Sequence, residues 1–201
     1  GSHRNVLQLS GTNAITASAV GTSGAQLVTT TATVTQAVWT HAAAVFRSSS
    51  DRSAYLNGGN RVDSTAAAGT QTAPTAASIA ARFATTWGGF YPGDVADFGI
   101  WNAALTDAEI ASLAAAVSCD QVRPQSLAFY ARLIRNFTDI KGGLALTDNG
   151  AGAVANHCRI FMRGETAMGN HMRHLMTEPF TLEDGSDFIL TEDGDYLLSE
   201  A

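Results

Sequence analysis

Aromatic residues in a glycine-rich stretch offer the clearest binding chemistry in this sequence. Trp87, Phe90 and Tyr91 lie close together and are interleaved with glycines. An aromatic face can stack on a sugar ring while polar groups of a loop fix the orientation of that ring. We therefore name Trp87, Phe90, Tyr91 and, from a second turn, Asn57 as candidate glycan-binding residues. The alternative is that the aromatic side chains pack in the core at one end of a β-sandwich.

Metal chemistry has weaker support. Asp94 and Asp97 could supply carboxylate oxygens to calcium, but this cation takes about six to eight oxygen ligands. A spacing of three residues also places them on opposite faces of a regular strand. We therefore expect no cofactor and keep calcium at Asp94 and Asp97 as the weak alternative. His157, Cys158, His171 and His174 lack a zinc-site framework and are expected to be exposed residues of a connector.

Catalytic patterns are missing from the sequence. A glucanase needs carboxyl groups on both sides of the scissile bond, commonly supplied as E-x-D-x-x-E from one strand, and the chain has no such motif. Glu109 falls in a predicted helix cap, Glu165 in a connector, and every other glutamate in the C-terminal tail. The sequence contains neither a G-x-S-x-G elbow nor a phosphate-binding loop. We expect a protein that is not an enzyme.

Charge and composition narrow the class of partner. Hydrophobic residues make up 45% of the 201 residues and charged residues only 15%, which suits a folded β-rich domain. Of the 18 acidic residues, eight lie between positions 178 and 200, where there is no Lys or Arg. The rest of the chain is nearly neutral, so we expect neither nucleic-acid binding nor membrane insertion. Cys119 and Cys158 are expected to be free thiols.

Short β-prone segments separated by turn residues fill most of the chain. Asn57-Gly58 and Gly59-Asn60 form the strongest turn signal, since a tight hairpin needs positive φ, and it predicts that residues 53–56 pair with 61–64. Strands are further expected at 6–9, 14–20, 25–34, 39–47, 77–83, 94–101, 127–133, 144–147 and 153–161, with a loop at 65–76. Trp39 and Trp101 are expected on strands, with their side chains in the core.

One helix is specified by its first turn. Thr106 and Glu109 have the spacing of a capping box, which predicts a helix beginning at Asp107. Ile110, Leu113 and Val117 would share one face of this helix and pack on a sheet.

The last segment repeats itself with a period of eight residues. Aromatic-to-leucine units at Phe180–Leu182, Phe188–Leu190 and Tyr196–Leu198 alternate with Asp-Gly turns and predict three short strands of a β-meander. Strands this short are marginal alone, so we expect the tail to dock on another chain or to oligomerise. The candidates for that contact are Phe180, Leu182, Phe188, Leu190, Tyr196 and Leu198.

Three motifs resemble the laminin-G-like domain of the concanavalin-A-like lectin and glucanase superfamily: WTHAAAVF at 39–46, RSAYLNG at 52–58, and FYPGDVADFGIWNAALTDAEIASL at 90–113. The resemblance implies an all-β fold, an antiparallel β-sandwich of the jelly-roll type with one short helix and a small C-terminal β-meander. We expect the sandwich at 4–161, a connector at 162–177 and the acidic tail at 178–201. Family members carry further strands first, so the sandwich either lacks these or has that edge filled by a partner chain or the C-terminal strands.

Residues 122–161 also resemble the continuation of this module in bacteriophage and prophage proteins. This resemblance implies a virion structural or adhesion module of the tail-fibre or capsid-decoration type, with glycan binding as an added role. Its partners would be other virion proteins, a second copy of the chain, or a cell-surface glycan. The alternatives are a carbohydrate-binding module of a secreted bacterial protein, which would be extracellular, and then a divergent glycoside hydrolase.

Overall fold

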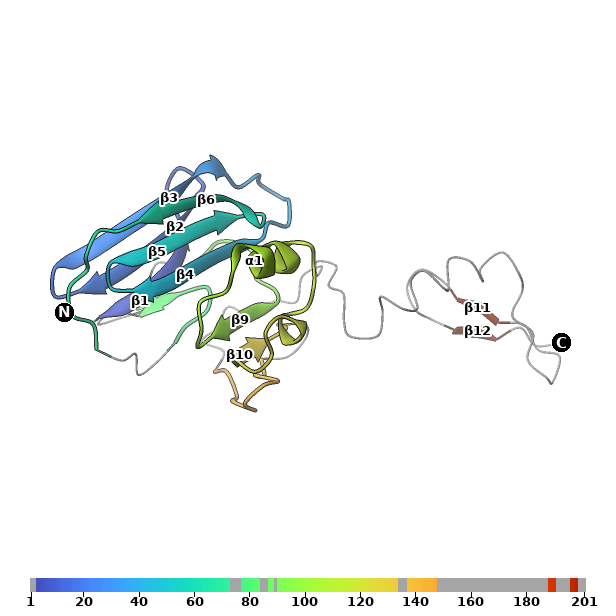
Figure 1. Cartoon of the computed structure of the whole chain (residues 1–201). Coiled ribbons are helices and arrows are strands. Elements are labelled where there is room, and N and C mark those ends of the chain that lie inside the picture. The colour runs from blue at the N-terminus through green and yellow to red at the C-terminus, as the bar shows by residue number, and fades with distance from the viewer. Residues whose placement is uncertain are drawn as a thin grey trace. The chain divides into compact units, whose positions relative to one another are not determined.

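The computed structural model describes residues 3–72, 77–83, 87–88, 90–133, 137–147, 188–190 and 196–198. The chain divides into two compact units, Gly1–Ile160 and Phe161–Ala201, which are taken separately below (Figure 1). None of the described helices is long and apolar enough to cross a membrane.

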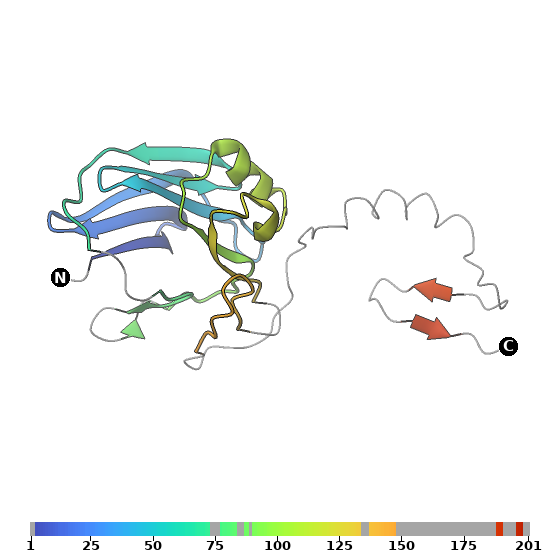
Figure 2. The same cartoon turned by 60° about the horizontal axis from the view of Figure 1, so that its bottom comes forward.

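Two antiparallel sheets of three strands form the body of the first unit (Figures 1 and 2). The first sheet has the order β1-β2-β3, with β1 at Arg4–Leu9, β2 at Ala14–Gly21 and β3 at Gly24–Thr33. The second has the order β4-β5-β6, with β4 at Ala42–Ser48, β5 at Asp51–Leu56 and β6 at Gly59–Ser64. These elements confirm the predicted all-β, antiparallel fold class.

The second sheet is covered on both of its faces. Ala54 packs with Ala17 and Val28 of the first sheet, while Val45 and Tyr55 pack with residues that follow β6, including Leu105 and Ile110. Because successive residues of a strand face opposite sides, β5 is buried along nearly its whole length. The central strand of the second sheet, β5, is therefore buried between the first sheet and an outer layer.

The outer layer holds the predicted helix. Helix α1 spans Asp107–Ala114, and its capping box is complete: Thr106 Oγ1 accepts from the Glu109 amide, and the Thr106 amide donates to Glu109 Oε2 at 2.7 Å. The prediction of its first residue is confirmed. Ile110 is buried, and Leu113 and Val117 pack partly buried against the same cluster, although Val117 lies beyond the end of the helix.

Strand β9 (Phe98–Trp101) and strand β10 (Leu127–Ala131) pair antiparallel beneath the helix, with the short 3-10 helix η1 (Cys119–Gln121) between them in sequence. Trp101 is half-buried, and its ring Nε1 donates to the Val122 carbonyl at 2.8 Å. Cys119 is buried and free, and burial raises the pKa of its thiol. Cys158 lies outside the described residues.

The hairpin prediction is confirmed. Ser53 pairs with Asp63 and Ala54 with Val62, and the turn carries positive φ at Asn57 (53°) and Gly58 (73°). The expected loop at 65–76 is free of strands over its described part, residues 65–72.

Several predicted strands are wrong in extent. The segment 77–83 forms a strand only at β7 (Arg82–Phe83), which pairs with β8 (Trp87–Gly88), because Ala80 has a left-handed φ of 59°. The strand expected at 94–101 begins at Phe98, because Asp97 has a φ of 52°. At 144–147 only an isolated bridge joins Ala145 to Thr138, and the strand expected at 153–161 lies outside the described residues.

The placement of Trp39 is also wrong. Strand β4 starts only at Ala42, so Trp39 precedes it, and 43% of this residue is exposed to solvent. The chain turns at residues 36 and 37, where Ala37 has a left-handed φ of 60°, and bends at Val38, so the extended backbone of β4 begins only after this turn.

In the second unit, β11 (Phe188–Leu190) and β12 (Tyr196–Leu198) pair antiparallel, with Phe188 opposite Leu198 and Leu190 opposite Tyr196. Two of the three strands predicted for the tail are therefore confirmed. The third, at Phe180–Leu182, lies outside the described residues.

Candidate functional site

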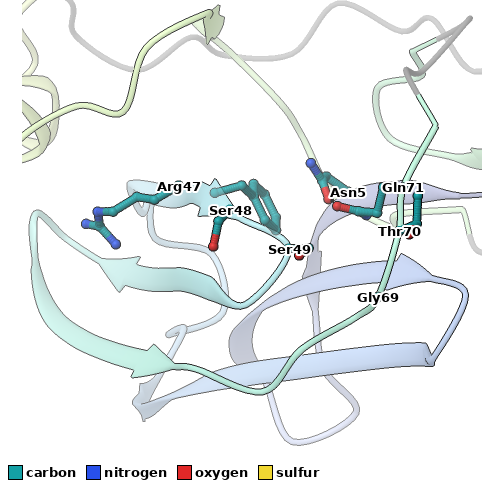
Figure 3. A pocket seen from close by; sticks show the side chains of 8 residues that line it. Asn5, Arg47, Ser48, Ser49, Gly69, Thr70 and Gln71 are labelled. Atoms are coloured by element: carbon teal, nitrogen blue, oxygen red, sulfur yellow. Dashed lines mark hydrogen bonds between the residues drawn. The ribbon is translucent and has the colours of Figure 1, made fainter.

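A shallow pocket of about 340 Å³ opens where the edge of the first sheet meets the end of β4 (Figure 3). Its wall comes from three parts of the chain: β1, the end of β4 with the turn after it, and the segment 69–71. The lining residues are Asn5, Phe46, Arg47, Ser48, Ser49, Gly69, Thr70 and Gln71.

Gln71 fastens one wall of this pocket to the first sheet. Its side-chain Nε2 donates to the Val20 carbonyl at 3.0 Å and to Asn5 Oδ1 at 3.1 Å. The backbone of Thr70 adds two bonds to Thr22, because its amide donates to Thr22 Oγ1 at 3.0 Å and its carbonyl accepts from the Thr22 amide at 3.1 Å. Residues 70 and 71 are thus held in one position over β1 and β2.

Gly69 permits this close approach. Its φ is +78°, a left-handed value that costs other residues strain, and a Cβ atom there would collide with the Thr22 hydroxyl. Glycine is therefore needed at the point where the pocket wall touches the turn between β2 and β3.

Arg52 holds the other wall of the pocket, the turn at Ser48 and Ser49, from inside the protein. This residue is fully buried, and its Nη2 donates to the Ser49 carbonyl at 2.8 Å and to the Ala66 carbonyl at 2.5 Å, while Nη1 donates to Ser64 Oγ at 3.2 Å. The Ser49 carbonyl also accepts from the Ala68 amide at 2.9 Å. The turn that carries Ser48 and Ser49 is consequently tied to the segment that leads into Gly69.

The pocket offers hydroxyl and amide groups beside the aromatic ring of Phe46, and none of the described residues that line it is a carboxylate. Figure 3 shows Arg47 extending away from Asn5 and Gln71, and its guanidinium is engaged elsewhere, by Ser53 at 2.7 Å and Asp51 at 3.3 Å. The described lining residues other than Arg47 are uncharged, and their hydroxyl and amide groups can exchange hydrogen bonds with the hydroxyl groups of a ligand. This lining supplies neither a nucleophile with a base nor an acid.

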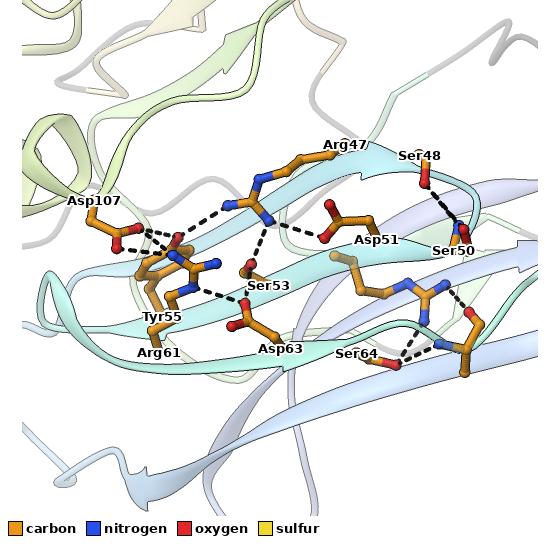
Figure 4. Close-up of polar contacts among 12 residues, drawn as sticks. Arg47, Ser48, Ser50, Asp51, Ser53, Tyr55, Arg61, Asp63, Ser64 and Asp107 are labelled. Atoms are coloured by element: carbon orange, nitrogen blue, oxygen red, sulfur yellow. Dashed lines mark hydrogen bonds and ion pairs between the residues drawn. The ribbon is translucent and has the colours of Figure 1, made fainter.

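The carboxylates of the second sheet instead take part in a network that joins β6 to helix α1 (Figure 4). Tyr55 donates to Asp107 Oδ1 at 2.7 Å, and Arg61 Nη1 lies 2.9 Å from both oxygens of Asp107. Arg61 Nε also binds Asp63 at 2.8 Å, and Asp63 accepts from Ser53.

These contacts keep both carboxyl groups ionised. The hydrogen bond from Tyr55 and then those from Arg61 lower the pKa of Asp107, and the hydrogen bonds from Arg61 and Ser53 lower the pKa of Asp63. Acid catalysts of glycoside hydrolysis need a raised pKa. Asp63 and Asp107 therefore serve the packing of the helix on the sheet and are unsuited to proton donation.

Phe90 and Tyr91 do not line this pocket. Phe90 is 63% exposed and Tyr91 is 39% exposed, so neither packs in the core, and both remain available to a ligand in a loop of their own. Trp87 lies on β8, and its side chain is outside the described part of the structure. The sequence left open whether these residues pack in the core, and for Phe90 and Tyr91 the structure excludes it.

The side chain and backbone of Asn57 hold the chain just before β4. Its Oδ1 accepts from the His41 amide at 3.1 Å, and its own amide donates to the His41 carbonyl at 2.8 Å. Among the described residues no contact joins Asn57 to Phe90 or Tyr91. The structure therefore does not bring Asn57 together with Phe90 and Tyr91, and the glycan-binding role predicted for these residues stays a prediction.

The weak calcium candidates are also separated by their surroundings. Asp94 is exposed, whereas Asp97 is partly buried, with its amide bound to the Arg132 carbonyl at 3.0 Å and its carboxylate 3.7 Å from Cys119 Sγ. Both precede β9, so the expectation that they alternate along a strand is wrong. Within the described ranges no three His, Cys, Asp or Glu residues gather as metal ligands.

The pocket-lining residues escaped the sequence analysis because Asn5, Ser48 and Gln71 are ordinary polar residues that lie far apart in sequence. The only signal in that region was the turn composition near residue 69, which marked a loop and no more.

Comparison with known proteins identifies a family whose sequence model matches this chain. A family model described as the concanavalin A-like lectin/glucanases superfamily matches residues 1–111. No curated protein matches the chain. Among solved structures, an S-layer domain-containing protein from Clostridium thermocellum ATCC 27405 is similar, with 22% identity and a TM-score of 0.35. That similarity covers 56% of this chain and 63% of the other, which is less than two thirds of its length.

Proposed function

The chain belongs to the concanavalin A-like lectin/glucanases superfamily, and on that premise we propose that it is a carbohydrate-binding domain without catalytic activity. The observation that carries the proposal is the pocket lined by Asn5, Ser48, Thr70 and Gln71. Its volume of about 340 Å³ falls at the lower end of the range usual for small-molecule sites, roughly 300–1,000 Å³, and suits one or two sugar rings.

The chemistry of the lining supports a neutral sugar. Hydroxyl and amide groups can both donate and accept, as sugar hydroxyls do, and Phe46 adds an aromatic surface among them. Gln71 and Ser49 are held by hydrogen bonds to the body of the protein, so the site is formed before a ligand arrives.

The exposed aromatic loop is the second candidate surface for the same function. Phe90 and Tyr91 present aromatic area to solvent, which is the requirement for stacking on a sugar ring. This surface and the pocket draw on different residues, so variants can tell them apart.

The superfamily includes glucanases as well as lectins, and the enzyme is therefore the alternative to exclude. Against it stands the lack of a carboxylate among the described residues that line the pocket, and the lowered pKa values of Asp63 and Asp107 make these two groups unsuited to act as the acid catalyst. Release of reducing ends from β-glucans by the purified chain would contradict the proposal of a domain that only binds.

The virion role, as a tail-fibre or decoration module, stays a prediction of the sequence that the comparisons do not support. The same holds for the location in a virion or, for a secreted module, outside the cell. Neither affects the test of carbohydrate binding.

Isothermal titration with sugars selected on a glycan array tests the proposal. Thr70→Ala should weaken binding by roughly 2- to 10-fold, the usual worth of one lost hydrogen bond. The matched control is Thr65→Ala, an exposed threonine that does not line the pocket, and it should bind like the wild type.

Two outcomes would overturn the assignment of the site or of the function. If Phe90→Ala and Tyr91→Ala abolish binding while Thr70→Ala does not, the ligand sits on the aromatic loop. If no glycan binds even at millimolar concentration, carbohydrate recognition itself is wrong.

A further inference from the structure

The second unit contains a ribbon whose two strands carry only apolar or aromatic residues. β11 consists of Phe188, Ile189 and Leu190, and β12 of Tyr196, Leu197 and Leu198. Their register places Phe188, Leu190, Tyr196 and Leu198 at positions that share one face, while Ile189 and Leu197 share the other. The sequence therefore puts apolar residues at both sets of positions, and the pairing of two strands by itself buries neither set.

The two strands are also two copies of one repeat. Each begins with an aromatic residue, ends with leucine two positions later, and is followed by a hydroxyl residue and then glutamate. Phe180–Leu182 repeats the aromatic-to-leucine spacing upstream. Because β11 pairs with β12, the structure demonstrates that one copy of the repeat is complementary to another. Among the described residues neither outer edge of this ribbon is paired with a further strand.

We propose that this ribbon associates with the same ribbon of a second copy of the chain. The second copy brings strands of identical sequence, whose complementarity the β11–β12 pair already displays. Pairing or stacking of such ribbons would bury apolar residues and give a partner to the strand edges that no described strand pairs with. The second unit is then a self-association element, independent of whether the first unit binds carbohydrate.

The charge of this segment gives the proposal a distinctive salt dependence. Positions 178–200 hold eight acidic residues and no Lys or Arg, so two copies repel each other electrostatically while their apolar strands attract. At about 1 M salt the screening length falls to about 3 Å, which removes the repulsion. Self-association should therefore become stronger as the salt concentration rises, whereas binding to a basic partner would become weaker.

Sedimentation velocity on the full chain over a dilution series, at low salt and in molar sodium chloride, tests the proposal. The wild type should exceed its monomer mass of 21.0 kDa, and more so at high salt. The double variant Leu190→Asn/Leu198→Asn should weaken association by at least about tenfold, because apolar contact area is lost. The control Thr191→Asn/Ser199→Asn changes the two neighbouring positions without removing apolar surface and should associate like the wild type.

Each remaining outcome overturns the proposal. A wild type that stays monomeric in molar salt has no self-association to explain. A double variant that assembles like the wild type places the contact elsewhere in the chain. A control that is as weak as the double variant denies a role to the apolar positions, and an association that weakens with salt indicates attraction between opposite charges.

Discussion

At the scale of single residues, burial alone determines the charge state of the His41 side chain. Desolvation lowers its pKa to about 4, and its Nδ1 atom has no hydrogen-bond partner among the described residues. The ring is therefore neutral at pH 7 and acts as part of the packing before β4. His41 belongs to the WTHAAAVF motif that carried the family resemblance, so its role there is structural.

We predict that His41 makes the fold less stable in mild acid. The unfolded chain takes up a proton near pH 6.5, whereas the folded chain resists until about pH 4, so stability is lost as the pH falls between these values. The loss reaches up to about 3 kcal/mol by the linkage of pKa to stability. Urea unfolding at intervals from pH 7 to pH 4 measures it, and His41→Gln should flatten this part of the profile.

Asp107 acts in a more acidic window. Its folded pKa is lowered by Tyr55 and Arg61, so its contribution is complete above the unfolded pKa of about 4 and disappears as the pH falls through the lower folded value. Asp107→Asn should therefore lower Tm at pH 7 and bring it closer to the wild-type value at pH 2.5, a test made by thermal unfolding at both values. An equal deficit at both pH values would show that the charge of Asp107 is irrelevant.

At the scale of elements, the turn between β5 and β6 is where local sequence and tertiary packing meet. Gly58 has a φ of +73°, and a Cβ atom there would lie 2.7 Å from Ala114 Cβ and 2.9 Å from Ala111 Cα. The glycine is thus required both by the turn and by helix α1, which passes directly over it.

Gly58→Ala should consequently be costly. The left-handed backbone contributes about 1–2 kcal/mol and the crowding against the helix about 1–3 kcal/mol, so we expect a loss of about 2–5 kcal/mol in the free energy of unfolding. Gly59→Ala is the matched control, since a Cβ atom there meets nothing within 4 Å, and its effect should stay within about 0.5 kcal/mol. Chemical denaturation of both variants makes the comparison; similar losses would refute the packing argument.

The elements that could be predicted are those fixed by neighbouring residues. The capping box of Thr106 and Glu109 and the Asn57-Gly58 turn act within a few positions, so their signals are complete in the sequence. The predicted ends of strands were wrong in two situations. In one, alanine occupies both faces of a strand and hides the alternation of polar and apolar residues; in the other, the backbone takes a left-handed conformation, as at Ala80 and Asp97. Alanine gives no sign of a positive φ, and aspartate, although it adopts such values more often than most residues, gives a weaker sign than glycine does.

At the scale of the whole molecule, the candidate site was beyond the sequence because no single segment contains it. Asn5 comes from the first sheet, Ser48 from the end of the second, and Thr70 from the segment that crosses between them. The aromatic candidates were found because they are neighbours in sequence. Residues that come together only after folding cannot be grouped from the sequence. The pocket also depends on Arg52, which holds the Ser49 carbonyl from inside the protein, and nothing in the sequence distinguishes Arg52 from any other arginine on a strand.

Because the pocket joins both sheets, a sugar bound there should stabilise the first unit as a whole. Ligand at a hundred times Kd contributes about 2.7 kcal/mol, which corresponds to a rise in Tm of about 5 to 10 °C for a domain of this size. If Thr70→Ala weakens binding tenfold, the same ligand concentration should yield about half of that stabilisation.

Leu190→Asn/Leu198→Asn, in the separate second unit, should leave the ligand-induced rise in Tm unchanged, since the pocket lies wholly within Gly1–Ile160. Thermal scans of the wild type, Thr70→Ala and this double variant, with and without sugar, measure all three effects. If the ligand-induced rise in Tm disappears in the double variant but persists in Thr70→Ala, the sugar binds to the C-terminal ribbon and not to the pocket.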